Sequence, residues 1–128
     1  METTTIPPMP ALEIDRQLAA LSAGRRPSAQ RRADRQVERQ IVWALLHCLQ
    51  DAHPGRGIVV FDGEEHVPCA DAKAAMEIVF NLDTAWVCLG RSWVCLITGN
   101  GADIISDCGA NPATEAAIDA AKAACGMA

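Results

Sequence analysis

The 128-residue chain has no tyrosine, and two phenylalanines and three tryptophans are its only aromatic residues. Its longest apolar run, Ile41 to Leu46, is far too short to cross a lipid bilayer, so no membrane partner is expected. The N-terminus lacks the basic segment and the long apolar core of a secretory signal peptide. We therefore expect a cytoplasmic protein.

Catalytic and metal-binding motifs are missing as well. The six cysteines form no C-x-x-C pair, which argues against a zinc site. In a reducing cytosol they are expected to be free thiols, buried as small hydrophobic side chains. No H-E-x-x-H motif, phosphate-binding glycine loop or cysteine–histidine nucleophile pattern is present. These absences predict a protein that is not an enzyme and that has no catalytic residues, no bound metal and no cofactor.

What the chain does contain is a repeated tetrapeptide, Trp-Val-Cys-Leu, at residues 86–89 and 93–96. Gly90 and Arg91 between the two copies predict a hairpin with a two-residue turn, and Asn100-Gly101 predicts a second turn. The result is a meander of three strands over 84–89, 92–98 and 102–107. In this register one face of the meander carries Trp86, Cys88, Trp93 and Cys95.

The opposite face of the meander carries Val87, Leu89, Val94 and Leu96, so both faces are apolar. A sheet with two apolar faces has to be covered on both sides, by helices or by another molecule. The sequence therefore predicts that the tryptophan and cysteine face is buried.

The remaining segments predict an α+β fold. A strand is expected at 57–62, followed by a polar loop at 62–66, and helices are expected at 11–23, 28–51, 70–82 and from Pro112 onward. The sheet is expected to be four-stranded and mainly antiparallel, in the order β-α-β-β-β-α, with an N-terminal helical extension. Residues 1–27 are interpreted as a flexible or partly helical arm, and 28–128 as one domain that includes the long helix.

The long predicted helix at 28–51 changes character along its length. Arginine and glutamine lie on several sides of its first half, whereas Ile41 to Leu46 is apolar nearly all round. A helix segment without a polar face is either deeply packed or part of an interface. Residues 37–49 are therefore a hypothetical homodimer contact.

Charge is unevenly distributed along the chain, whose net charge is −5. Six of the nine arginines lie within 25–39, and Arg31, Arg35 and Arg39 recur at a spacing that puts them on one helix face. Such a face can follow phosphates, so a nucleic-acid-binding regulator that uses residues 25–43 is one hypothesis. Asp34 and Glu38 can instead pair with these arginines along the helix, and no aromatic residue accompanies them before Trp43.

The loop after the first predicted strand carries Asp62, Glu64, Glu65 and His66. Carboxylates beside a histidine can bind a divalent metal or transfer protons, so a small metal-dependent enzyme is a further hypothesis. The alternative is a solvated acidic loop, and no second histidine or aspartate cluster completes a ligand set.

The run from Trp93 to Asp107, with its Gly99-Asn100-Gly101 turn and its Asp103-Ile104-Ile105-Ser106-Asp107 end, resembles a family of small uncharacterised proteins. These proteins are encoded by phages, plasmids and integrated elements of proteobacteria. The resemblance extends over about 57–120. Thr98 and Cys108 depart from the aromatic residue and the tyrosine that the family favours there.

This resemblance implies a mobile-element origin rather than a reaction. Together with the missing catalytic motifs it favours an interaction protein that binds and blocks a host protein or ribonucleoprotein complex, as an anti-CRISPR inhibitor of a bacterial defence system does. Nucleic acid is the less favoured partner, because residues 55–128 carry ten acidic and four basic residues. The candidate partner-binding residues are Arg31, Arg32, Arg35, Arg39, Trp43, Asp62, Glu64 and Glu65.

Overall fold

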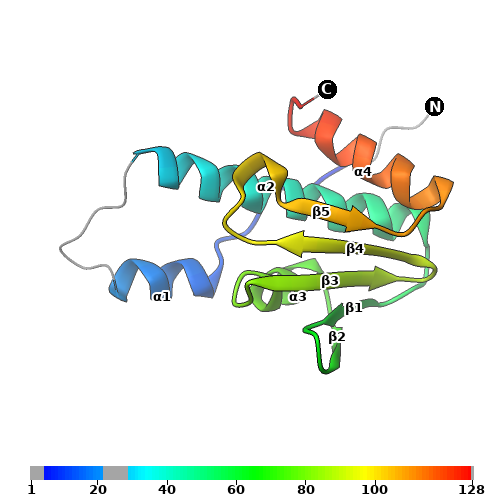
Figure 1. Cartoon of the computed structure of the whole chain (residues 1–128), viewed down its shortest axis with the longest axis horizontal. Helices are drawn as coiled ribbons and strands as arrows, with labels where there is room; N and C mark the ends of the chain where they lie inside the picture. Colours follow the sequence, from blue (N-terminus) through cyan, green and yellow to red (C-terminus); the bar gives the residue numbers. More distant parts are fainter. Residues whose placement is uncertain (1–4, 22–28, 128) are drawn as a thin grey trace.

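A computed structural model describes residues 5–21 and 29–127 of the chain. Within these residues four helices pack on an antiparallel sheet of five strands, which confirms the α+β class (Figure 1). The elements are α1 (Glu13–Leu21), α2 (Ala29–Ala52), β1 (Ile58–Phe61), β2 (His66–Cys69), α3 (Ala72–Val79), β3 (Thr84–Leu89), β4 (Ser92–Ile97), the single 3-10 turn η1 (Gly101–Asp103), β5 (Ile105–Cys108) and α4 (Pro112–Ala124).

The β3–β4 hairpin has the predicted register. Trp86 pairs with Cys95 and Cys88 pairs with Trp93. The turn begins at Gly90, whose φ of +54° is accessible to glycine and costly for other residues. The second predicted turn is wider than expected, because Ile104 donates its backbone N–H to the carbonyl of Gly101 and so closes η1 before β5 begins.

The expectation of four strands was wrong by one, since the sheet also contains β2. A carboxylate oxygen of Asp62 accepts the backbone N–H groups of Glu64 and Glu65, at 2.8 and 2.7 Å. These bonds fold the acidic residues into a tight turn, which returns the chain alongside β1. His66, which had been interpreted as part of a loop, therefore pairs with Phe61 at the start of β2.

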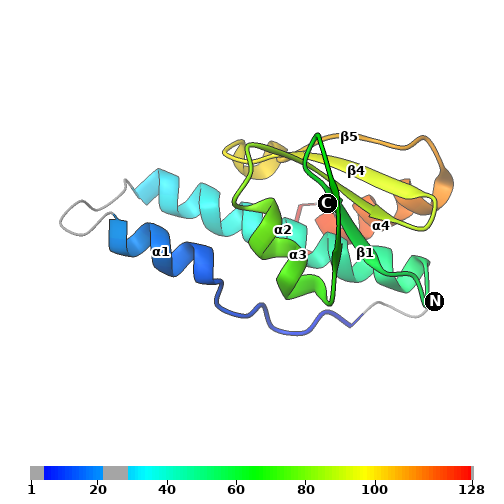
Figure 2. The same cartoon turned by 90° about the horizontal axis from the view of Figure 1, so that it is seen from below.

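The strands lie in the order β2-β1-β3-β4-β5, and all the described helices lie on one side of the sheet (Figure 2). We call this side the inner face and the opposite side the outer face. Alternate strand residues point inward and are fully or almost fully buried: Ile58, Val60, Ala85, Val87, Leu89, Val94 and Leu96. They form one core with the apolar sides of α2, α3 and α4.

The apolar half of α2 is buried within this core. Every residue from Ile41 to Leu46 is 8% exposed or less, and the Trp43 indole N–H donates to the carbonyl of Pro7 at 2.7 Å. The apolar stretch therefore has its partners inside the chain, and residues 41–46 offer no surface for a second copy. A homodimer through 37–49 stays a prediction.

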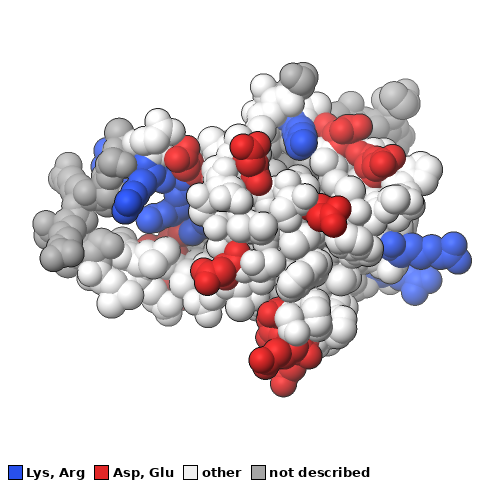
Figure 3. Space-filling model, in the orientation of Figure 1, with Lys and Arg blue, Asp and Glu red and all other residues white. Residues whose placement is uncertain are grey.

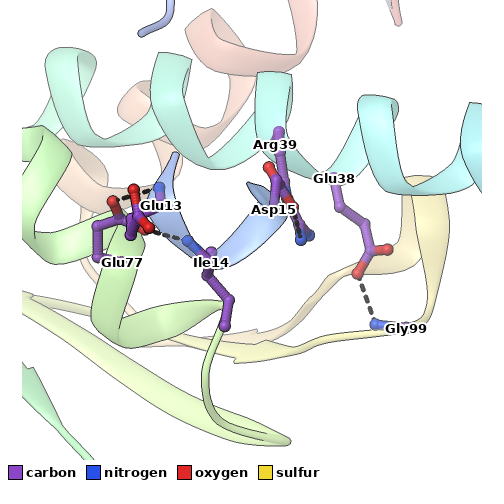
Figure 4. Close-up of polar contacts among 7 residues, drawn as sticks. All are labelled: Glu13, Ile14, Asp15, Glu38, Arg39, Glu77 and Gly99. Carbon is purple, nitrogen blue, oxygen red and sulfur yellow. Dashed lines mark hydrogen bonds and ion pairs between the residues drawn. The ribbon is translucent and has the colours of Figure 1, made fainter. Parts of the chain in front are cut away.

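The described part of the predicted N-terminal arm lies along the domain. Leu12 is 2% exposed, whereas no residue of α1 itself is buried. Polar contacts hold α1 in place: the Glu77 carboxylate accepts the backbone N–H groups of Glu13 and Ile14, and Arg39 pairs with Asp15 (Figure 4). The predicted cap at Ser28 lies outside the described residues, and the flexibility of the arm stays a prediction.

Candidate interaction surface

Two rows of side chains cross the outer face, because directly paired residues of antiparallel strands point to the same side of a sheet. The first row consists of Pro68, Val59, Cys88 and Trp93, and it ends at the backbone of Gly109. The second row consists of His66, Phe61, Trp86, Cys95 and Asp107.

Three aromatic rings of the second row touch one another. The Phe61 ring centroid lies 4.4 Å from that of His66 and 5.5 Å from that of Trp86. Tilted arrangements of this kind stabilise a cluster beyond the area that it buries. The cluster spans three paired strands, β2, β1 and β3.

The outer face is only partly covered. Trp93 is 37% exposed, Trp86, Cys88 and Phe61 are half-buried, and Cys95 is 7% exposed. The prediction that Trp86, Cys88, Trp93 and Cys95 share one face is confirmed, but the prediction that this face is buried is wrong for the described chain. Every described helix packs on the inner face, and none remains for the outer one (Figure 2).

Trp93 is held in place by Gly109. The Gly109 backbone N–H donates to the Trp93 carbonyl at 3.0 Å, and a Cβ atom at Gly109 would lie only 2.9 Å from the indole nitrogen. The absence of a side chain at Gly109 therefore lets the indole lie against the backbone. Trp93 is an exposed aromatic residue with a fixed position, as interface anchors are.

The acidic turn between β1 and β2 borders the aromatic cluster. A Cβ atom on Gly63 would lie 3.9 Å from the Trp86 ring. The backbone N–H groups of Glu65 and Glu64 hold the pKa of the Asp62 carboxyl below its ordinary value, so Asp62 serves to shape the turn. Glu64 and Glu65 are exposed beside the cluster.

The charges around the outer face are mainly negative. Figure 3, which looks onto this face, shows no Lys or Arg in its middle and Asp or Glu around it, with one group of carboxylates at the β1–β2 turn. An apolar centre surrounded by carboxylates repels phosphates and attracts a basic surface.

The arginine-rich helix does not present the surface that its spacing predicted. Arg39 is 6% exposed, because its guanidinium lies 2.6 Å from an Asp15 oxygen and 3.9 Å from the centroid of the Phe80 ring. Trp43 is 8% exposed, so both side chains are engaged mainly within the chain. Of the other candidates, Arg31 and Arg32 are exposed and Arg35 is half-buried.

The two acidic residues expected to pair with these arginines have other partners. Asp34 accepts a hydrogen bond from the Gln30 side chain at 2.8 Å. Glu38, which is 4% exposed, accepts the backbone N–H of Gly99 and so ties α2 to the end of the meander (Figure 4). Glu38 therefore positions the meander against α2, whereas the Asp34 contact lies within α2 itself.

Metal-binding clusters and disulfides were sought among the described residues. No three His, Cys, Asp or Glu side chains there are placed to hold a metal ion, and all six cysteines are free thiols. Burial raises the pKa of Cys88, which keeps this outer-face thiol protonated.

Sequence reasoning missed one serine–histidine contact. His53, directly after α2, places Nε2 2.7 Å from the Ser92 hydroxyl oxygen, which also lies 2.7 Å from the Thr114 hydroxyl. Ser92 is 1% exposed, so its hydroxyl cannot reach a substrate. The two residues are 39 positions apart, and only the return of the hairpin to α4 brings them together.

None of the helices in the described ranges has the length and hydropathy that crossing a bilayer requires. Comparison of the chain with known protein families, with curated proteins and with solved structures finds no match.

Proposed function

We propose that the chain is a non-enzymatic interaction protein that binds a partner protein through its outer face. The observation that carries this proposal is the position of Trp93, Trp86 and Phe61, three large aromatic residues that lie on a rigid sheet and that no described helix covers. Exposed aromatic clusters of this kind are typical of protein interfaces, where tryptophan and its neighbours supply most of the binding energy.

The partner that fits this surface is a protein with an apolar centre and a basic flank. Glu64 and Glu65 extend beside the aromatic cluster, and Asp107 ends its row. A second copy of the chain would bring another predominantly acidic rim to this face and no basic flank, which makes it a less complementary partner than a basic protein. Single-stranded nucleic acid stacks on aromatic sheet faces too, but it needs a positive groove to follow its backbone, and this face is negative.

The host-directed part of the proposal is supported by the resemblance of 57–120 to mobile-element proteins. A protein from such an element that binds without catalysing acts by occupying a surface of a host macromolecule in the cytoplasm. Inhibition of a bacterial defence complex, in the manner of anti-CRISPR proteins, is the specific form that we propose.

The test compares capture of proteins from a bacterial lysate by three immobilised variants. The wild type and Leu21→Ser, a substitution at an apolar side chain that is 85% exposed but lies far along α1, should retain the same basic protein. Trp93→Ala should weaken its retention by about 30-fold, as the loss of about 2 kcal/mol from an interface anchor requires. Retention should also fall as salt is added.

Two results would overturn the proposal. One is retention of every captured protein by Trp93→Ala and by Trp86→Ala at the level of the wild type. The other is capture of nucleic acid that is lost when Arg31, Arg32 and Arg35 are replaced by Glu, which would establish the alternative of a nucleic-acid-binding regulator.

A further inference from the structure

A second feature lies at the end of the sheet where β3 turns into β4. A hollow with a volume of about 290 Å³ is lined there by His53, Arg56, Gly90 and Arg91. Figure 3 shows Lys and Arg atoms that project at this end of the molecule, apart from the Asp and Glu atoms. The hollow shares no residue with the two rows of the outer face.

The two arginines of the hollow have no counter-charge in the described chain. The ion pairs found among the described residues involve Arg16, Arg39 and Lys73, and no hydrogen bond of the Arg56 or Arg91 guanidinium is found there either. Both arginines are exposed, so their guanidinium groups are accessible to a ligand from solution. A bound anion would supply the counter-charge and satisfy their N–H groups.

The back of the hollow is built from buried hydrogen-bonding groups. The Ser92 hydroxyl, 2.7 Å from His53 Nε2, is itself held by the Thr114 hydroxyl, and both hydroxyl-bearing residues are 1% exposed or less. The Thr114 hydroxyl lies 2.9 Å from the Asn111 side-chain oxygen, at the start of α4. The imidazole ring is therefore held in one orientation, with Nε2 engaged in the protein interior.

Gly90 preserves the space in front of this ring. A Cβ atom at Gly90 would lie 3.0 Å from His53 Nδ1 and 3.6 Å from the Cγ of Arg56. Because the other ring nitrogen is engaged with Ser92, Nδ1 is the nitrogen beside the hollow. The lining of the hollow thus carries two arginines and one oriented imidazole.

From this arrangement we infer that the hollow binds the phosphate group of a small phosphomonoester. One guanidinium satisfies both oxygens of a carboxylate through two parallel hydrogen bonds, so a carboxylate leaves the second arginine unused. A phosphomonoester carries about −1.5 to −2 charges and three acceptor oxygens, which matches two guanidinium groups and an imidazole. The inference stands independently of the proposed partner on the outer face.

The test is a titration of the ¹⁵N-labelled chain with inorganic phosphate, followed by the backbone amide signals. Signals of Gly90, Arg91 and Arg56 should shift and saturate with a dissociation constant of about 1 mM, whereas sodium chloride at equal ionic strength should leave them in place. Acetate should bind at least about tenfold more weakly than phosphate. Glycerol phosphate and adenosine monophosphate then distinguish the source, since a preference for one of them identifies a non-nucleotide or a nucleotide ligand.

Variants decide whether the hollow is the site. Arg56→Ala combined with Arg91→Ala should weaken phosphate binding by at least about tenfold. Arg32→Ala, an exposed arginine on α2, is the matched control and should leave the affinity unchanged. Equal binding of acetate and phosphate, unchanged affinity of the double variant, or shifts confined to the first turns of α2 would each overturn the inference.

Discussion

The Glu77 carboxylate on α3 caps the first turn of α1, since it accepts the backbone N–H groups of Glu13 at 2.7 Å and Ile14 at 3.0 Å (Figure 4). Glu77 is more than 60 positions away in the chain from both Glu13 and Ile14. No residue of α1 is fully buried, and Ile14 is the residue of α1 that packs against the core. This contact and the Asp15–Arg39 ion pair therefore add polar support to the apolar anchors Leu12 and Ile14.

Glu77→Ala should loosen α1 without unfolding the sheet. Loss of a helix cap costs about 1 kcal/mol, so amide hydrogen exchange over 16–21 should accelerate about fivefold while exchange in β3 and β4 stays unchanged. Asp119→Ala, at an exposed position within α4, is the control and should leave exchange in α1 as it is. Faster exchange throughout the sheet would contradict this role of Glu77.

Acid should release α1 before it unfolds the core. Burial opposes ionisation of Glu77, but the hydrogen bonds from Ile14, Glu13 and Lys73 outweigh it and lower its pKa below the ordinary value of 4.5. A lowered pKa means that the stabilisation is complete above pH 4.5 and is lost as the pH falls through the lower, folded-state pKa. Hydrogen exchange in α1, measured from pH 6 downward, should show this transition in the wild type, and its persistence in Glu77→Ala would exclude Glu77 as the cause.

Gly109→Ala should destabilise the protein, because the new methyl group meets the Trp93 indole at 2.9 Å. Overpacking of this kind costs about 1–3 kcal/mol, and we expect a lower urea midpoint together with a red shift of tryptophan emission. Gly57→Ala is the matched control: nothing lies within 4 Å of its Cβ position, so its stability should be unchanged or higher. Equal midpoints for both variants would show that the indole moves away at no cost.

The two faces of β4 should respond differently to truncation. Leu96→Ala empties a fully buried inner-face position and should cost about 2–5 kcal/mol of unfolding free energy. Trp93→Ala should cost less than Leu96→Ala despite its larger side chain, because 37% of Trp93 is already exposed. Urea denaturation of both variants measures the difference, and a larger loss for Trp93→Ala would mean that the outer face is covered in solution.

Arg39→Ala should destabilise the fold by about 2 kcal/mol, since it leaves Asp15 without its counter-charge and removes the cation from the Phe80 ring. This value is below that of a fully buried pair because the Asp15 side chain is 34% exposed. Arg32→Ala, at an exposed position on the same helix, should change stability by less than about 0.5 kcal/mol. Thermal unfolding of the two variants measures this difference in stability. Equal stabilities of Arg39→Ala and Arg32→Ala would mean that Arg39 acts only as a surface charge.

The local pattern of the meander was sufficient to predict its central hairpin. Gly90 specifies the turn, and a repeat of period two then determines which side chains share a face with Trp93. The strand β2 was missed because His66–Cys69 is short, polar at its start and interrupted by Pro68. Its pairing depends on the Asp62 turn, and its side chains provide no periodic signal of their own.

The solvent exposure of the outer face could not be predicted, because it depends on which side of the sheet the helices pack against. Both faces of the meander are apolar. The alternation of side chains along a strand is the same whether a face is covered by α2 or exposed to solvent. The same applies to Arg39, whose helical spacing matches that of exposed arginines. Its burial depends on Asp15 and Phe80, which come from two other parts of the chain.

The edges of the sheet determine how another molecule can join it. At one edge, Pro68 in β2 has no backbone N–H to donate to an added strand. At the other edge, a bulge opposite Cys95 and Leu96 interrupts the pairing of β5, and the Asp107 carboxylate accepts the Cys108 N–H. Strand addition and fibril growth are disfavoured at both edges. A protein with an uncovered apolar face is thereby protected from stacking edge to edge, and a partner of that face joins it by lying across the strands.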